Sequence, residues 1–316
     1  MPELQNSTLR ERKIPSEQLQ ILVRGGTLYA VVDACNVPMV PKKVLEVGDQ
    51  RAVSLYRGTA EEELWEVAPY LMKVDQSAME WLKLNIKKEG WGIFIAAKAD
   101  LEVLRTHLRH FLKVQSPRGE VWRFRFYDPR VIEFFLPICS AAELKAFFGP
   151  IMAYGVAEPG LKEAKFWQEA TDWNAMQMSP PRVEMRPYFR IRPEQEKEFE
   201  KYADQVFLRE TVLYVKEQHA DKVEGLSEAI IQQRVKTAID RAKNFGLRLE
   251  DSILFFLALM FDIAPNFYEQ AGIHKALTTG ESSPDLRMDE LLDNTTDDDW
   301  DQAEESYDEG KWQDGD

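Results

Sequence analysis

The residues with the clearest chemical potential lie in RFRFYDPRV, residues 123–131, where the carboxylate of Asp128 stands among arginines and a tyrosine. If the fold brings a histidine close, such a carboxylate could serve a hydrolase. His107 and His110 form an H-x-x-H pair a short distance upstream. The stretch therefore admits three interpretations: a hydrolase-like site around Asp128 and His107, a basic surface for a partner, or a structural corner.

The structural interpretation explains Asp128 and Pro129 most simply. Asp followed by Pro fits the N-cap and first turn of a helix over PRVIEFFL, and the cap alone is worth about 0.5–2 kcal/mol. A capping carboxylate also opposes use of that helix end as a phosphate site. The preceding strand, expected over 121–127, places Arg123, Arg125 and Tyr127 on one face, where the arginines could pair with Asp128 or another acid. Asp128 and Pro129 are predicted to form a structural corner. For the arginines, two roles are left: bracing that corner or binding a partner.

The wider segment 105–130 carries an excess of positive charge with aromatic residues interleaved. One interpretation is a docking face for an acidic partner, and the other is the solvated side of a helix and a strand. The residues that would bind a partner are Arg105, His107, Arg109, Arg123, Arg125, Tyr127 and Arg130.

Signatures of catalysis and of bound cofactors are missing. The chain has no G-x-S-x-G, G-x-G-x-x-G, Walker loop, H-E-x-x-H or C-x-x-C motif. The H-x-x-H pair has no Cys or acidic cluster close in sequence to complete a metal site. We therefore predict no catalytic residues, no metal and no cofactor.

The elements that must position these residues alternate between strands and helices up to about residue 155. Apolar runs such as TLYAVVDA (27–34) and WGIFIAA (91–97) are typical of strands buried on both faces. Capping boxes at Thr59/Glu62 and Ser140/Glu143 begin two of the helices between them. This pattern predicts an α/β fold, with α+β as the alternative, in which a mixed sheet is flanked by helices.

Beyond residue 190 the pattern becomes helical, and the last thirty residues become acidic. The run ILFFLALMF (253–261) predicts a core helix or, with Phe255, Phe256 and Phe261, a groove for cargo. The expected organisation is a flexible arm (1–20), the sheet domain (21–155), a connecting segment (156–190), a smaller all-helical lobe (191–283) and a disordered acidic tail (284–316).

The net charge of -14 is concentrated in the tail, since residues 285–316 hold fourteen Asp/Glu and two Lys/Arg. The nearly neutral body argues against binding to nucleic acid or to an anionic membrane. No apolar run approaches the ~20 residues that span a bilayer, and the N-terminus lacks a signal-peptide core. The tail could also fold over the basic 105–130 face and compete with an acidic partner.

Six segments in order carry a family resemblance: LYAVVDA, LYRGTAEEELWEVAPYLMKV, GWGIFI, LRTHLRHFLKV, RFRFYDPRV and FFGPI. Together, over about residues 27–155, they resemble the effector adaptor/chaperone domain of bacterial type VI secretion, first catalogued as a domain of unknown function and later called Tap or TEC adaptors. The resemblance marks as signature positions His107, Arg123, Arg125, Tyr127, Asp128, Pro129 and Arg130.

The resemblance implies a non-enzymatic role in the cytoplasm of a Gram-negative bacterium. Members of this family bind a toxic effector and help to load it onto the VgrG spike before secretion. The expected partners are therefore a cognate effector and VgrG. The acidic tail is not part of the family pattern.

Overall fold

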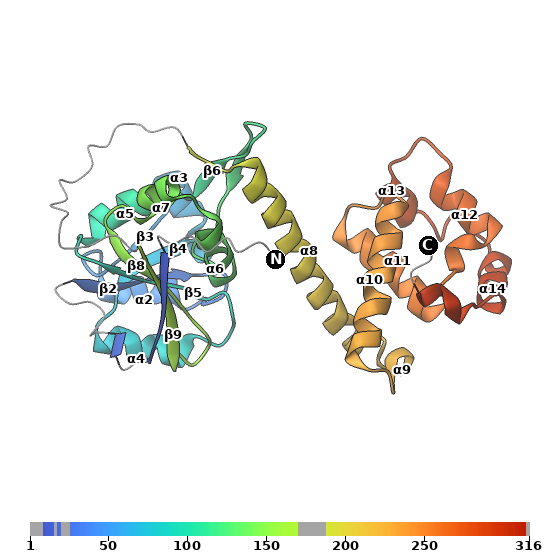
Figure 1. Cartoon of the computed structure of the whole chain (residues 1–316), viewed down its shortest axis with the longest axis horizontal. Helices are drawn as coiled ribbons and strands as arrows, with labels where there is room; N and C mark the ends of the chain where they lie inside the picture. Colours follow the sequence, from blue (N-terminus) through green and yellow to red (C-terminus); the bar gives the residue numbers. More distant parts are fainter. Residues whose placement is uncertain (1–8, 16–17, 20–25, 170–187, 314–316) are drawn as a thin grey trace. The chain divides into compact units, whose positions relative to one another are not determined.

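The protein, seen in a computed structural model, divides into two compact units, Met1–Glu196 and Lys197–Asp316, called here the sheet unit and the helical unit (Figure 1). Each unit has its own hydrophobic core. The residues that the structure describes are 9–15, 18–19, 26–169 and 188–313.

Within the described residues, the sheet unit is built on a seven-stranded sheet in which every neighbouring pair runs antiparallel. The expected sheet with flanking helices is confirmed, but the seven strands are all antiparallel instead of mixed, which makes the fold α+β, the alternative given above. The strands, in their order across the sheet, are β1 (Leu9–Pro15), β9 (Glu163–Glu169), β8 (Ile151–Ala157), β5 (Gly92–Ala97), β2 (Thr27–Asp33), β4 (Pro69–Lys73) and β3 (Ala52–Ser54).

Both faces of the inner strands β2 and β5 are buried, which explains why these strands are apolar nearly throughout. Alternate residues of β2, including Ala30 and Val32, share a core cluster with Val44 and Leu82 from two helices. On other strands, side chains such as Tyr154 of β8 meet a different helix, where the Phe147 ring stacks at 4.9 Å. The helices of this unit are α2 (Val40–Val47), α3 (Thr59–Glu63), the 3-10 helix η2 (Trp65–Val67), α4 (Gln76–Asn85), α5 (Leu101–Arg109), α6 (Pro129–Ile138) and α7 (Ala141–Phe148).

Three helices that carry or adjoin the candidate residues begin at capping side chains. Asp100 accepts a hydrogen bond from the Val103 N–H at the start of α5 (2.9 Å). Asp128 caps α6, with Pro129 in its first turn. Ser140 and Glu143 form the predicted capping box of α7. These local signals fix where α5, α6 and α7 begin.

A second, three-stranded sheet has the order β10 (Phe189–Arg190), β6 (Lys113–Gln115) and β7 (Val121–Arg123) among the described residues. The strand expected over 121–127 therefore ends at Arg123. After Phe124 the chain turns, and the Asp128 N–H donates to the Arg125 carbonyl (2.9 Å). Arg123 and Arg125 consequently do not share a strand face.

The helical unit is a bundle with an apolar core. Helix α10 buries the predicted stripe that includes Ile231, Val235 and Ile239, and Ser227 caps it as expected. The helices that lie wholly or mainly in this unit are α8 (Pro193–Gln218), α9 (Ala220–Val223), α10 (Glu228–Asn244), α11 (Glu250–Asp262), η3 (Phe267–Glu269), α12 (Ala271–Thr278), α13 (Pro284–Asp289), α14 (Asp297–Glu305) and η4 (Glu309–Trp312).

The expected flexible arm holds a strand. Residues Leu9–Pro15 form β1, which pairs along its length with β9, a strand within the expected connecting segment. The charged sequence LRERKIP lacks the apolar pattern from which a strand is predicted. This edge strand has exposed faces and is stabilised by its backbone hydrogen bonds to β9. The remainder of the arm, apart from residues 18–19, and residues 170–187 of the connecting segment lie outside the described residues.

The prediction of a disordered acidic tail is wrong for residues 284–313. They form α13, α14 and η4, and the side chains of Met288, Leu291, Ala303 and Trp312 are buried in the core of the helical unit. These few apolar residues are spaced so that each reaches the core while the acids point outward. The tail is therefore part of the helical unit.

Among the described residues, no helix combines the length and apolar character needed to cross a membrane.

Candidate functional site

The carboxylate of Asp128 is engaged within its own corner. Its Oδ1 accepts hydrogen bonds from the Arg130 backbone N–H (3.0 Å) and from Arg130 Nε (3.0 Å), and its Oδ2 accepts from Arg130 Nη2 (2.8 Å). Asp128 is only 4% exposed. A carboxylate held by a helix N-terminus and by a bidentate arginine is suited to fixing the corner of the chain.

Arg125 reaches the far end of the central strand β2. Its guanidinium forms an ion pair with Asp33, the last residue of that strand, whose side chain is fully buried. The Asp33 carboxylate also accepts from the Cys35 N–H (3.1 Å) and from Asn36 Nδ2 (3.4 Å). Arg125 therefore ties the loop before α6 to the sheet, while 41% of its side chain stays exposed.

Tyr127 lies beneath this ion pair. Its ring is buried, and the Arg125 guanidinium lies 5.8 Å from the ring centre. Burial raises the pKa of the Tyr127 hydroxyl, so the side chain remains neutral. Tyr127 thus acts as a packed platform for Arg125.

Arg105 and Arg109 of α5 hold a separate segment, residues 55–61. Arg105 Nη2 donates to the Tyr56 carbonyl (3.1 Å) and to Glu61 Oε1 (3.0 Å). Arg109 Nη1 donates to the Leu55 carbonyl (2.6 Å), and burial together with the nearby arginines lowers its pKa. Both arginines are half-buried, so they brace the 55–61 segment instead of forming an open basic face.

His107 is packed under the end of α7. Its Nε2 is 2.8 Å from the Phe147 carbonyl oxygen, and its ring meets the Phe111 ring edge-on. Gly149 lies directly against the imidazole, where a Cβ would overlap the ring. His110 bonds the Thr106 carbonyl of its own helix, and the described residues contain no cluster of metal-ligating side chains. His107 therefore serves packing.

Arg123 differs from the other candidate arginines, because it lies exposed on the short strand β7, opposite Lys113. The predicted partner-binding residues thus occupy several places. Arg125, Tyr127 and Arg130 gather with the corner residue Asp128 near the end of β2, whereas Arg105 and Arg109 brace residues 55–61.

The segment braced by α5 leads into an exposed apolar patch that the sequence analysis did not identify. Leu64, Trp65 and Val67 are 37%, 45% and 42% exposed and are called here the apolar patch. The sequence could have predicted this patch from LWEV (64–67), which follows the acidic helix α3. An aromatic residue next to such a solvent-facing helix is not expected to pack into the core. Exposed Trp is typical of protein interfaces.

The apolar patch lies beside the Asp33–Arg125 ion pair. The Ala34 N–H donates to the Ala68 carbonyl (3.2 Å), and Cys35 Sγ lies 3.8 Å from the Val67 carbonyl oxygen. Burial and the Asp33 charge raise the pKa of the Cys35 thiol, so it is not a reactive thiolate. An aromatic and aliphatic surface bordered by a half-exposed arginine has the composition of a protein-docking site.

The three phenylalanines offered as a cargo groove form core instead. Phe256 is fully buried against Phe267 at 4.9 Å, and Phe261 packs against Trp312 at 4.6 Å. Phe255 is half-buried against the same cluster. The C-terminal segment folds back and supplies Trp312 to this core, so the three phenylalanines do not line one open groove.

The comparisons with known proteins match one family model. No curated protein and no solved structure matches the chain. Residues 28–146, less than half of the chain, match a family model described as "Domain of unknown function (DUF4123)". The match covers Arg105 through Arg130, the apolar patch and Asp33, and this family is known as an effector adaptor domain of type VI secretion.

Proposed function

We propose that this chain is a non-enzymatic type VI secretion adaptor that acts in the cytoplasm of a Gram-negative bacterium. It binds a cognate toxic effector and assists the loading of that effector onto the VgrG spike. The observation that carries the proposal is the family match over residues 28–146, which includes every signature residue of the sheet unit.

The geometry of the signature residues supports a binding role over a catalytic one. Asp128 is held by Arg130, and His107 is engaged by the Phe147 carbonyl and packed against Gly149. The hydrolase alternative needs an accessible carboxylate within reach of a histidine in a concave site. The two side chains it would use are both engaged in holding the fold.

The apolar patch is the surface that we assign to partner binding. The residues around it are braced by side chains from α5, and Tyr70 Oη donates to the Trp65 carbonyl (2.7 Å). A braced surface loses little conformational entropy on association, which favours affinity. Trp65 would supply the buried aromatic anchor, and Arg125 the polar rim.

The test is co-purification of the tagged full-length chain with the products of its neighbouring genes. We expect an effector or a spike protein to co-elute at moderate salt. The Trp65→Ala variant should weaken that association by about tenfold or more, as the loss of an interface anchor does. Leu84→Ala is the matched control, because Leu84 is 70% exposed on α4, away from the apolar patch in sequence.

Absence of both partner classes from the eluate would overturn the adaptor function. Equal losses for Trp65→Ala and Leu84→Ala would overturn the assignment of the apolar patch.

A further inference from the structure

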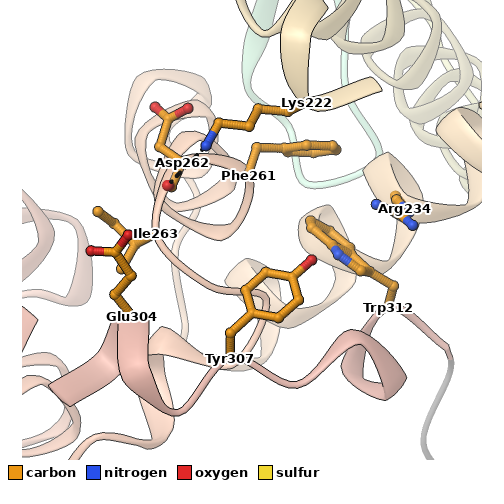
Figure 2. Close-up of a pocket in the computed structure, with 8 residues that line it drawn as sticks. All are labelled: Lys222, Arg234, Phe261, Asp262, Ile263, Glu304, Tyr307 and Trp312. Atoms are coloured by element: carbon orange, nitrogen blue, oxygen red, sulfur yellow. Dashed lines mark hydrogen bonds between the residues drawn. The ribbon is translucent and has the colours of Figure 1, made fainter. Parts of the chain in front are cut away.

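A pocket of about 410 Å³ lies in the helical unit, and the C-terminal segment supplies much of its lining (Figure 2). Its volume lies within the range of sites that hold a small ligand or a single inserted side chain. The lining residues are Lys222, Arg234, Phe261, Asp262, Ile263, Glu304, Tyr307 and Trp312.

The C-terminal wall of the pocket is fixed in place by specific contacts. Trp312 is 4% exposed and packs against Phe261. Asn266 Nδ2 donates to the Ser306 carbonyl (2.8 Å), and the Asp308 N–H donates to Asn266 Oδ1 (3.0 Å). These bonds flank Tyr307, so the pocket is preorganised rather than a gap beside a loose end.

The pocket combines an open aromatic face with carboxylates. Tyr307 is 49% exposed, and Asp262 and Glu304 line the pocket with it (Figure 2). Asp262 Oδ1 is 2.8 Å from His219 Nδ1, whereas the Glu304 carboxylate has no ion-pair partner among the described residues. An aromatic face beside an uncompensated carboxylate is a suitable environment for a cation.

The same wall already holds one arginine in this way. The Arg234 guanidinium lies 5.2 Å from the Trp312 ring centre and forms an ion pair with Glu309. An arginine suits such a site better than a lysine, because its planar group can stack on a ring and pair with a carboxylate at once. The Arg234–Trp312–Glu309 arrangement is thus an internal example of the recognition that Tyr307 and Glu304 could provide.

The charge of the whole unit favours a basic partner. Residues 197–316 contain 28 Asp/Glu and 13 Lys/Arg, whereas residues 1–196 contain 26 and 27. An excess of this size attracts basic segments and raises their association rate. Lys222 opposes a cation, although its ammonium is directed to the Asp262 backbone carbonyl at 3.4 Å.

We propose that this pocket receives an arginine side chain of a partner protein, with the guanidinium stacked on Tyr307 and paired with Glu304. The helical unit lies outside residues 28–146, so this site is additional to the function proposed for the sheet unit. It also gives the acidic C-terminal segment a role, since that segment builds the pocket.

The test uses the full-length chain labelled with 5-fluorotryptophan and observed by fluorine NMR. The Trp312 signal is assigned by its loss in Trp312→Phe. The probe is the blocked tripeptide acetyl-Gly-Arg-Gly-amide, compared with the same peptide carrying Gln or Glu. We expect the Arg peptide alone to shift the Trp312 signal saturably, with a dissociation constant in the millimolar range.

Substitutions then locate the contacts. Glu304→Gln should weaken Arg-peptide binding by about threefold to tenfold, and Tyr307→Leu by a similar factor. Lys222→Gln should strengthen it, because a competing cation is removed. Glu305→Gln is the matched control: it makes the same charge change on an exposed neighbour that does not line the pocket, and should alter binding less than twofold.

Three outcomes would overturn the proposal. The first is the absence of a saturable shift with the Arg peptide, and the second is an equal shift with the Gln or Glu peptide. The third is an equal loss in Glu304→Gln and Glu305→Gln, which would show general attraction to an acidic surface. None of these outcomes bears on whether the sheet unit binds an effector or spike protein.

Discussion

Arg125 and Asp33 form an ion pair that ties the loop before α6 to the end of the central strand β2. The pair is asymmetric, since the Asp33 side chain is fully buried whereas 41% of the Arg125 side chain is exposed. A buried carboxylate that loses its cation is left with an unmet desolvation penalty. The ion pair therefore stabilises the part of the sheet that adjoins the apolar patch.

Replacing Arg125 with Ala should destabilise the sheet unit by about 1–3 kcal/mol, less than a fully buried pair because the arginine is partly solvated. Hydrogen exchange of the β2 and β5 amides, read by mass spectrometry, measures this unit separately from the helical unit. Arg123→Ala is the matched control, since Arg123 is exposed on β7 and should change exchange little. Equal effects of the two substitutions would contradict the role given to the Asp33 pair.

The contrast between Asp128 and Arg125 shows what the sequence could predict. Asp128 and Pro129 define a cap through contacts within a few residues, so the corner was predictable from local chemistry. The partner of Arg125 lies 92 residues away, and only the folded sheet brings the two together. The capping box predicted at Thr59 and Glu62 is wrong: α3 begins at Thr59 itself, and Gly58 takes the N-cap position without a side-chain hydrogen bond.

The apolar patch and the folded tail were missed for a related reason. The exposed fraction of the Trp65 side chain depends on how α3 and η2 are placed in the folded unit. The pattern of apolar residues in this short segment does not predict that placement. In the tail, composition suggested disorder because acids outnumber apolar residues. Four buried apolar side chains nevertheless suffice to fold the tail, because they pack into the core that the other helices of the helical unit form.

Gly149 should tolerate no side chain, because the His107 ring occupies the space that a Cβ would need. Its φ of +48° adds strain for any other residue. Gly149→Ala should therefore destabilise the sheet unit by about 2–5 kcal/mol, from backbone strain and overpacking together. Urea unfolding, followed by exchange of the sheet amides, measures the effect.

Gly48→Ala separates the two causes. Gly48 has a φ of +77° and a ψ of 164°, a backbone conformation that only glycine adopts readily, but nothing within 4 Å of the position of a Cβ, so only the backbone strain of about 1–3 kcal/mol applies. Combining Gly149→Ala with His107→Ala should recover part of the loss as a coupling energy. Strict additivity of the two changes would show that His107 does not pack against Gly149.

Trp312 should be essential to the helical unit although it lies near the end of an acidic tail. It is 4% exposed and contacts Phe261 and Arg234. Trp312→Ala should cost about 3–5 kcal/mol, as for other large core aromatics, and should increase amide exchange in α10 and α11. Leu292→Ala, in the same segment but 58% exposed, should stay within about 0.5 kcal/mol. Unchanged amide exchange of α10 and α11 in Trp312→Ala would show that the tail does not contribute to the core of the helical unit.

Asp299 should make the stability of the helical unit sensitive to acid. Its carboxylate accepts the Thr296 N–H (2.9 Å) and the Thr296 hydroxyl (2.8 Å), completing the capping box of α14, and it accepts from Gln270 Nε2 at 2.9 Å. These bonds, the backbone one above all, hold the pKa of Asp299 below its usual value. The stabilisation is therefore fully present above the unfolded pKa of about 3.9 and is lost as the pH falls through the folded pKa.

The comparison that tests this is the melting temperature of Asp299→Ala against the parent chain between about pH 7 and pH 3. Asp299→Ala should melt lower at neutral pH, and the difference should narrow as the carboxylate of the parent chain becomes protonated. Asp298→Ala is the control, because it removes an exposed acid from the same first turn without removing the capping box. A difference for Asp299→Ala that stays constant down to pH 3 would show that the capping carboxylate contributes through packing alone, because only its charged form is favoured by the bonds to Thr296.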